Sequence, residues 1–459
     1  MPIKKLTISG LRGFGGPQTL DLAVPNDKPG TGLTTLVGPN NGGKSTIVEA
    51  LRAVGSNQNA SFTEGKRNKQ ALDRISIQAT DESGLTHELK TVDGGGSETE
   101  WVRPQRHKAF PRLYVLPSRR YFGTFFGRSI MEREQYTRGY ALPANRGSPM
   151  DQFPYRLFRV LANRTAFDKV LGRVLEPVPD WTIEQNDNGN YYLRFNTGQG
   201  YHNSDGLGEG LVSLFFIVDA LYDSEAGEVI AVDEPELSLH PSLQRRLASL
   251  LCDYSATRQI ICATHSPYFV DIGAFVDGGV IARIHKRSNE SIISPLSRDS
   301  AKRIGGFLEN LNNPHILGLD AREAFFLDDG VILVEGQEDV LIYQKILADM
   351  GQSVKGTFFG WGVGGADNLR TVASILKDLG FVHVVGILDK NKENLIPELQ
   401  RELPEYRFFA IPTDNVRSKP HKPETPAVTG LSDTQGNLKP EYKDDLVKIF
   451  DKIRGFLSS

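Results

Sequence analysis

The chain has 459 residues, enough for about two to four domains. Its 39% hydrophobic and 24% charged residues are ordinary for a globular protein, and a net charge of −3 excludes a strongly basic protein, so only a local patch could bind nucleic acid. No apolar run reaches the about 18 residues of a membrane span, and residues 1–8 predict a strand rather than a signal peptide. We therefore expect a cytoplasmic protein with no membrane partner.

The first elements are predicted strands. Residues 5–9 and 18–22 predict two strands joined by a glycine-containing loop. Residues 33–37, Leu-Thr-Thr-Leu-Val, predict a buried strand, and residues 46–52 predict the start of a helix.

Between this strand and this helix lies a phosphate-loop pattern, G-x-x-x-x-G-K-[ST]. A chance match in a glycine-rich loop is the alternative, and the flanking strand and helix disfavour it. Glycines let backbone N–H groups close around phosphates, while Lys44 reaches the β and γ phosphates and Ser45 holds Mg²⁺. We assign the binding of ATP and Mg²⁺ to Gly38, Asn40, Asn41, Gly42, Gly43, Lys44, Ser45 and Thr46.

Further strands are predicted at 74–78 and 87–92, and a basic segment follows at 103–146. This segment contains ten Lys or Arg and only two acids, with aromatic residues between them. Basic charge beside stackable rings is typical of a nucleic-acid surface. The alternative is that some arginines serve the nucleotide, the other charges face solvent and the aromatics lie in the core. The sequence favours neither interpretation.

Residues 154–174 predict helix, and residues 181–195 predict a hairpin whose turn is 186–190. We expect a helical insertion at about 123–180. From Leu207 onward, helices and strands alternate, which is typical of an α/β sheet.

Two later strands complete a predicted ATPase site. Residues 228–234 form an apolar strand ending in two acids, of which Asp233 would reach the Mg²⁺ shell and Glu234 would polarise the attacking water. Residues 259–265 form a strand ending in His265, which could donate to the γ phosphate and report its loss.

This order of motifs resembles the ABC-type ATPases, in the branch with SMC-like and recombination-type members. The resemblance implies ATP bound between two heads, and hence a homodimer or higher homo-oligomer. It implies that Ser204 and Gly208 act on a partner's nucleotide from a signature-like loop, and that residues 238–241 contact that partner. The family's glutamine loop has no clear match, although Arg119 and Arg120 are near its expected position. No heptad coiled coil separates the ATPase halves, which argues against a long-armed SMC protein.

The C-terminal part predicts a second α/β unit that begins near Gly330. Its strands end in acids: Glu335 with Asp339 four residues later, and Asp389 after residues 382–388, with a glycine turn at 360–365 between them. Carboxylates gathered at one edge of a parallel sheet suit Mg²⁺ or Mn²⁺. Strands that simply end in acids are common and provide the alternative.

This layout resembles the TOPRIM fold, and an ABC-type head followed by such a domain resembles the OLD (overcoming lysogenization defect) family. The resemblance implies metal roles for Glu335, Asp339 and Asp389, and for Asn391 in place of the family's usual second Asp. Lys419 and Lys422 are candidates for stabilising phosphate charge. The predicted fold is α/β: an ABC-type P-loop ATPase domain over 1–325 and a TOPRIM-like parallel α/β domain over 326–459.

These features predict an ATP-hydrolysing, metal-dependent DNA endonuclease of the OLD type that serves anti-phage defence. Its catalytic residues would be Glu234, His265, Glu335 and Asp389. One alternative is an ATPase sensor or scaffold with a degenerate TOPRIM site that controls a second defence protein. Another is a recombination or repair ATPase acting on DNA ends.

Overall fold

The structure is a computed structural model. It describes residues 2–56, 59–72, 74–94, 96–102, 111–120, 124–128, 153–196, 200–203, 209–308, 326–327, 329–354, 356–360, 362–421 and 427–458. The chain divides into two compact units, residues 1–293 and 294–459. In the described ranges, no helix is both long enough and apolar enough to cross a bilayer.

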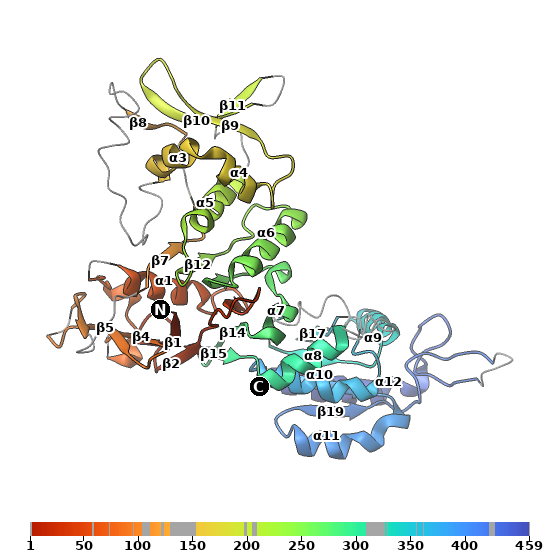
Figure 1. Ribbon diagram of the computed structural model, residues 1–459. Coiled ribbons are helices and arrows are strands. Elements are labelled where there is room, and N and C mark those ends of the chain that lie inside the picture. Colours follow the sequence, from red (N-terminus) through yellow and green to blue (C-terminus); the bar gives the residue numbers. More distant parts are fainter. Residues whose placement is uncertain are drawn as a thin grey trace. The chain divides into compact units, whose positions relative to one another are not determined.

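The first unit contains a six-stranded sheet in the order β15-β14-β3-β13-β12-β7 (Figure 1). Its strands are β3 (Leu33–Val37), β7 (Leu113–Leu116), β12 (Val229–Asp233), β13 (Gln259–Ala263), β14 (Val280–Arg287) and β15 (Glu290–Pro295). The strands from β14 to β7 pair in parallel. Every residue of β3, β7, β12 and β13 is buried, which is typical of a parallel sheet covered on both faces. The helices of this part are α1 (Lys44–Gly55), α6 (Pro241–Tyr254) and α7 (Ile272–Asp277).

A five-stranded antiparallel sheet accompanies it, in the order β2-β1-β4-β5-β6. Its strands are β1 (Ile3–Ser9), β2 (Gln18–Asp21), β4 (Ser76–Asp81), β5 (Thr86–Thr91) and β6 (Thr99–Val102). The predicted N-terminal strands are therefore confirmed. One buried side chain ties the two sheets together: Gln259 of β13 donates to the carbonyls of Ile3 and Ala23 at 2.6 and 2.8 Å.

The predicted insertion, at about 123–180, contains helices and the first strand of a small antiparallel sheet, whose other strands extend to residue 203. The helices are α3 (Phe153–Ala162) and α4 (Arg164–Leu171), and the strands are β8 (Phe126–Arg128), β9 (Asp180–Gln185), β10 (Asn190–Asn196) and β11 (Tyr201–Asn203) (Figure 1). The hairpin predicted at 181–195 is confirmed by the pairing of β9 with β10. This region is joined to α5 (Glu209–Asp223) by a buried ion pair, in which Arg156 of α3 donates to Asp219 of α5 at 2.6 and 2.8 Å.

The second unit contains a four-stranded parallel sheet in the order β17-β16-β18-β19. Its strands are β16 (Val331–Leu333), β17 (Thr357–Phe358), β18 (Val384–Leu388) and β19 (Arg407–Ala410). Its helices are α8 (Arg298–Leu308), α9 (Gln337–Asp349), α10 (Ala366–Asp378), α11 (Ile396–Glu402) and α12 (Lys443–Leu457) (Figure 1). The predicted second α/β unit with a parallel sheet is thus present.

The division between the units lies at 293/294, whereas the predicted domain boundary lies at 325/326. The reason is α8 and the residue before it: the hydroxyls of Ser297 and Ser300 both donate to Asp378 in α10. Residues 309–325, which precede the predicted boundary, lie outside the described residues.

Candidate functional site

The predicted phosphate loop connects β3 to α1, as its flanks require. Three of its residues have positive φ: Gly38 at 126°, Asn41 at 63° and Gly43 at 119°. A Cβ on Gly38 would lie 2.2 Å from the carbonyl oxygen of Ile284 in β14, so this position needs glycine for space as well as for φ. Asn40 and Ser45 are exposed while Gly42 and Thr46 are buried, so the loop presents one face to solvent.

Lys44 is held inside this loop. Its Nζ donates to the carbonyls of Gly38 and Pro39 at 2.9 and 3.0 Å, and lies 3.4 Å from Nδ1 of His265. Burial lowers the pKa of Lys44 to about 8, although the acids after β12 oppose that shift. An anion beside this ammonium would stabilise its charge and raise its pKa again, which fits a phosphate.

Asp233 is the last residue of β12 and is buried. Burial raises the pKa of Asp233 to about 6, against a hydrogen bond from Ser45. A cation between these two residues would relieve the burial of a carboxylate, so the pair fits Mg²⁺. Glu234 follows with a φ of 49°, and its Oε1 lies 3.9 Å from Nε2 of His265. The structure therefore brings Lys44, Ser45, Asp233, Glu234 and His265 together at the carboxyl ends of the strands.

Glu236 was not identified from the sequence. It accepts from the Thr264 hydroxyl at 2.7 Å and from the backbone N–H of His265 at 2.5 Å. Burial raises its pKa above the usual value. This carboxylate thereby fixes the loop that carries His265. Its only sequence signal is a third acid after the strand, in the run Asp-Glu-Pro-Glu.

The predicted signature residues Ser204 and Gly208 lie outside the described residues. α5 begins directly after them, and its first turn contacts the predicted partner-contacting loop. Glu209 accepts from the Ser238 hydroxyl at 3.3 Å, and a Cβ on Gly210 would lie 2.2 Å from the Ser238 carbonyl oxygen. The described end of the signature-like segment therefore lies against residues 238–241.

The second group of predicted residues lies at the carboxyl ends of β16 and β18. The backbone N–H of Asp389 donates to Oε1 of Glu335 at 3.1 Å, and the N–H of Gly336 donates to Oδ2 of Asp339 at 2.9 Å. Burial, with Glu335 nearby, raises the pKa of Asp389 to about 8 and that of Asp339 to about 6. The three carboxylates are thus close enough to disfavour one another's charge.

A glycine turn packs on these acids. Gly365 donates to the carbonyl of Glu335 at 2.8 Å. A Cβ on Gly362, whose φ is 88°, would lie 2.6 Å from the Cα of Gly336. This close approach explains the glycine-rich sequence between β17 and α10.

The three carboxylates do not converge as a ligand set. Glu335 and Asp339 face backbone N–H groups, and the described residues contain no group of three His, Cys, Asp or Glu side chains arranged to hold a metal ion. Asn391 is exposed, and its amide donates to the carbonyl of Asp414 at 3.4 Å. Metal binding by these four residues remains a prediction.

Lys419 lies near the acids. It lowers the pKa of both Asp339 and Asp389, opposing their burial, and its Nζ lies 3.4 Å from Oε2 of Glu338. Lys422, the other candidate, lies outside the described residues.

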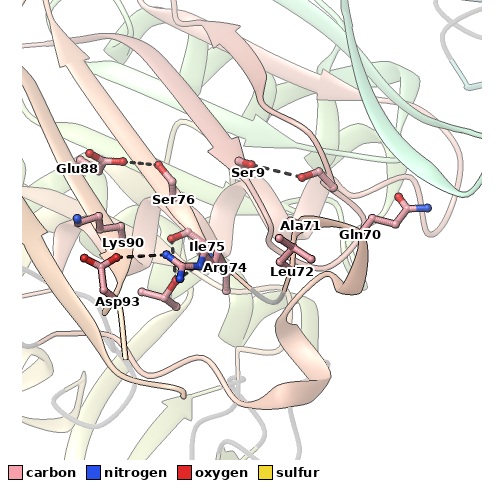
Figure 2. Close-up of a pocket in the computed structure, with 12 residues that line it drawn as sticks. Ser9, Gln70, Ala71, Leu72, Arg74, Ile75, Ser76, Glu88, Lys90 and Asp93 are labelled. Carbon is pink, nitrogen blue, oxygen red and sulfur yellow. Dashed lines mark hydrogen bonds and ion pairs between the residues drawn. The ribbon is translucent and has the colours of Figure 1, made fainter. Parts of the chain in front are cut away.

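A groove of about 480 Å³ lies on the five-stranded sheet of the first unit (Figure 2). Figure 2 shows Arg74 paired with Asp93, and Ser76 bonded to Glu88. None of the predicted site residues lines it.

Comparison with known families matches the first unit to ATPases. A family model described as "AAA domain, putative AbiEii toxin, Type IV TA system" matches residues 99–271, and one described as "AAA domain" matches residues 5–120. Together with the phosphate loop and the acids after β12, these matches show a P-loop ATPase fold in the first unit.

Two proteins that are named as nucleases are similar in sequence to parts of this chain. The chain is 32% identical over 145 residues to "OLD nuclease" of Thermus scotoductus, covering 29% of this chain and 26% of that protein. It is 24% identical over 199 residues to "Endonuclease GajA" of Bacillus cereus, covering 42% and 32%. The chain thus matches only about a quarter to a third of the length of these relatives. The resemblance to the OLD family, with an ATPase head, is confirmed.

Solved structures give a weaker likeness. The SMC head domain from Thermotoga maritima matches 65% of this chain and 100% of its own, at 15% identity and a TM-score of 0.38.

Replacing Lys44 tests the phosphate loop. Lys44→Ala removes the only buried ammonium described at this loop, so we expect ATP to bind about tenfold more weakly or worse. Titration with a fluorescent ATP analogue measures this. Lys90→Ala, which alters the groove of Figure 2, is the matched control and should leave affinity unchanged. If only Lys90→Ala lost affinity for ATP, the nucleotide would bind in the groove and not at the phosphate loop.

The raised pKa of Asp389 predicts a pH-dependent stability. Its folded-state pKa of about 8 lies above the usual 3.8, so the stabilisation is complete below 3.8 and is lost as the pH rises through 8. Without divalent cations, Asp389→Asn should therefore lose less thermal stability than the wild type between pH 6 and pH 9.

Melting curves by circular dichroism measure this difference. Asp349→Asn, which changes an exposed acid at the end of α9, should behave like the wild type. Equal losses in the wild type and Asp389→Asn would contradict the burial of this carboxylate.

Proposed function

We propose that this chain is an ATP-binding and ATP-hydrolysing, metal-dependent DNA endonuclease of the OLD type that serves anti-phage defence. The observation that carries the proposal is a P-loop ATPase site in one unit, with mutually repelling carboxylates at a parallel sheet edge in the other. The nuclease names of two relatives support the second activity.

In the ATPase unit, the loop from Gly38 to Thr46 would hold the phosphates, and Ser45 with Asp233 would hold Mg²⁺. The ion would neutralise charge on the phosphates. Glu234 would accept a proton from the attacking water, and His265 would donate to the γ phosphate. Burial together with Lys44 lowers the pKa of His265, so its ring is neutral near pH 7 and offers one N–H donor. The signature-like residues imply that a second copy completes this site.

In the second unit, Glu335, Asp339 and Asp389 would hold Mg²⁺ or Mn²⁺, which would activate water and stabilise the leaving oxygen of a phosphodiester. Carboxylate oxygens are the ligands that hard cations prefer, and these acids raise one another's pKa; Glu335 and Asp339 would have to turn from the backbone N–H groups they face to converge on one ion. Lys419 would place positive charge beside the phosphate.

A second candidate function is an ATPase sensor or scaffold that controls a separate effector protein. The position of Asn391 favours it, since this amide contacts the carbonyl of Asp414 rather than the acids. A neutral ligand would also bind a cation more weakly than the aspartate it replaces.

One substitution separates the two functions. For the endonuclease, Asp389→Ala should reduce plasmid cleavage in Mn²⁺ to background while ATP hydrolysis persists, because the two sites use different residues. Glu234→Gln is the reciprocal control: without the proposed general base, ATP hydrolysis should slow about a hundredfold to ten-thousandfold and leave a residual rate. Cleavage that survives in Asp389→Ala would remove the nuclease assignment, and wild-type protein without nicking activity would favour the sensor.

The basic segment 103–146 is the proposed DNA contact, and most of it lies outside the described residues. Exchange of Arg133 and Arg138 for Glu should weaken DNA binding and lower the slope of log affinity against log salt by about 0.9 per lost phosphate contact. Binding measured from low to moderate salt gives this slope. An unchanged slope would place the DNA contact elsewhere.

A further inference from the structure

Arg120 follows β7 and is buried beside the acids of the ATPase site, with 8% of its surface exposed. Its Nη1 donates to the carbonyls of Pro117 and Asp233 at 2.8 and 2.6 Å. Its Nη2 donates to the carbonyl of Glu234 at 2.7 Å. One guanidinium therefore holds the backbone of both acids that follow β12.

The backbone of Glu234 needs such support. Its φ of 49° is unfavourable for a residue with a side chain and persists only where neighbouring groups fix it. Its N–H donates to the carbonyl of Ala263 at 2.7 Å, and its carbonyl accepts from Arg120. These two bonds fix the peptide groups on both sides of the Glu234 side chain.

The same guanidinium reaches α5. Its Nε donates to Oγ of buried Ser213 at 2.7 Å. Ser213 lies one turn after Glu209, whose carboxylate accepts from Ser238. Arg120 thus joins the helix that follows the signature-like segment to the backbone of Glu234.

Electrostatics keeps this residue charged. Burial lowers the pKa of Arg120 to about 10, and the carboxylates of Asp233, Glu236 and Glu234 oppose that shift. The group therefore remains a cation near pH 7 and keeps all its donors.

We propose that Arg120 is a positioning residue for ATP hydrolysis, which holds Glu234 in its strained conformation and couples that conformation to α5 through Ser213. The proposal rests on the proposed ATPase function. In this role Arg120 acts through the protein, since four of its five N–H donors are bound to protein oxygens.

Ser213→Ala tests the coupling with a small change, and the chain offers a matched control. At the opposite end of α5, Nε of Arg258 donates to Oγ of Ser224, also at 2.7 Å. Ser224→Ala therefore removes an equal arginine–serine bond away from the acids. We expect Ser213→Ala to lower kcat about threefold to tenfold, with the Kd for ATP and the melting temperature close to those of Ser224→Ala.

Arg120→Lys tests the residue itself. A lysine keeps the charge but cannot donate hydrogen bonds to the three carbonyls and the hydroxyl with the same geometry. We therefore expect kcat for ATP hydrolysis to fall about tenfold to a hundredfold. The residual rate of Glu234→Gln should not fall further when Arg120→Lys is added, because the two residues act through one step. A merely structural role would lower kcat equally in both backgrounds.

Two results overturn the proposal. One is a Ser213→Ala variant whose kcat equals that of Ser224→Ala while the wild type hydrolyses ATP. The other is an Arg120→Lys effect that persists in full with Glu234→Gln. Absence of hydrolysis in the wild type would instead overturn the proposed ATPase function itself, and this role with it.

Discussion

Parallel pairing of β3, β13, β12 and β7 is the constraint on which the first unit depends. The registers pair Leu36 with Ala263, Asp233 with Ala263, and Val232 with Leu116, so the strands end at nearly the same level. The loops that follow these strands therefore all begin at the same edge of the sheet. Four groups that are distant in sequence meet at this edge, each after a different strand: the phosphate loop, Glu234, His265 and Arg120.

The same arrangement recurs in the second unit, where Glu335 follows β16 and Asp389 follows β18 at one edge of the sheet. In both units the edge holds a half-buried or buried carboxylate whose pKa is raised, Asp233 in one and Asp389 in the other. Burying a carboxylate without a partner costs free energy, so such residues are candidates for binding a cation. The units differ in how the acids are arranged: Ser45 already bonds Asp233, whereas Glu335 and Asp339 face backbone N–H groups.

Local patterns made the phosphate loop and the acids after β12 predictable, because both motifs lie on single strand–loop segments. The sequence could not identify Glu236 as the group that fixes His265, because that contact joins loops from two strands. The contacts of Arg120 could not be predicted either. Apart from Pro117, its acceptors lie 93 to 114 residues away in the sequence, in α5, at the end of β12 and directly after β12. For Asn391, the triplet after β18 suggested a ligand, but a carbonyl in a later loop accepts its amide. The unit boundary was missed because the packing of α8 depends on hydroxyl contacts with α10 that no periodicity reveals.

We propose that this one polypeptide carries two separate cation-dependent centres. The decisive measurement is anomalous diffraction at the manganese edge from crystals grown with a non-hydrolysable ATP analogue and Mn²⁺. We predict anomalous density both beside Ser45 and Asp233 and among Glu335, Asp339 and Asp389. Density at the first position alone, with the carboxylates of Glu335 and Asp339 still bonded to backbone N–H groups, would contradict the second centre.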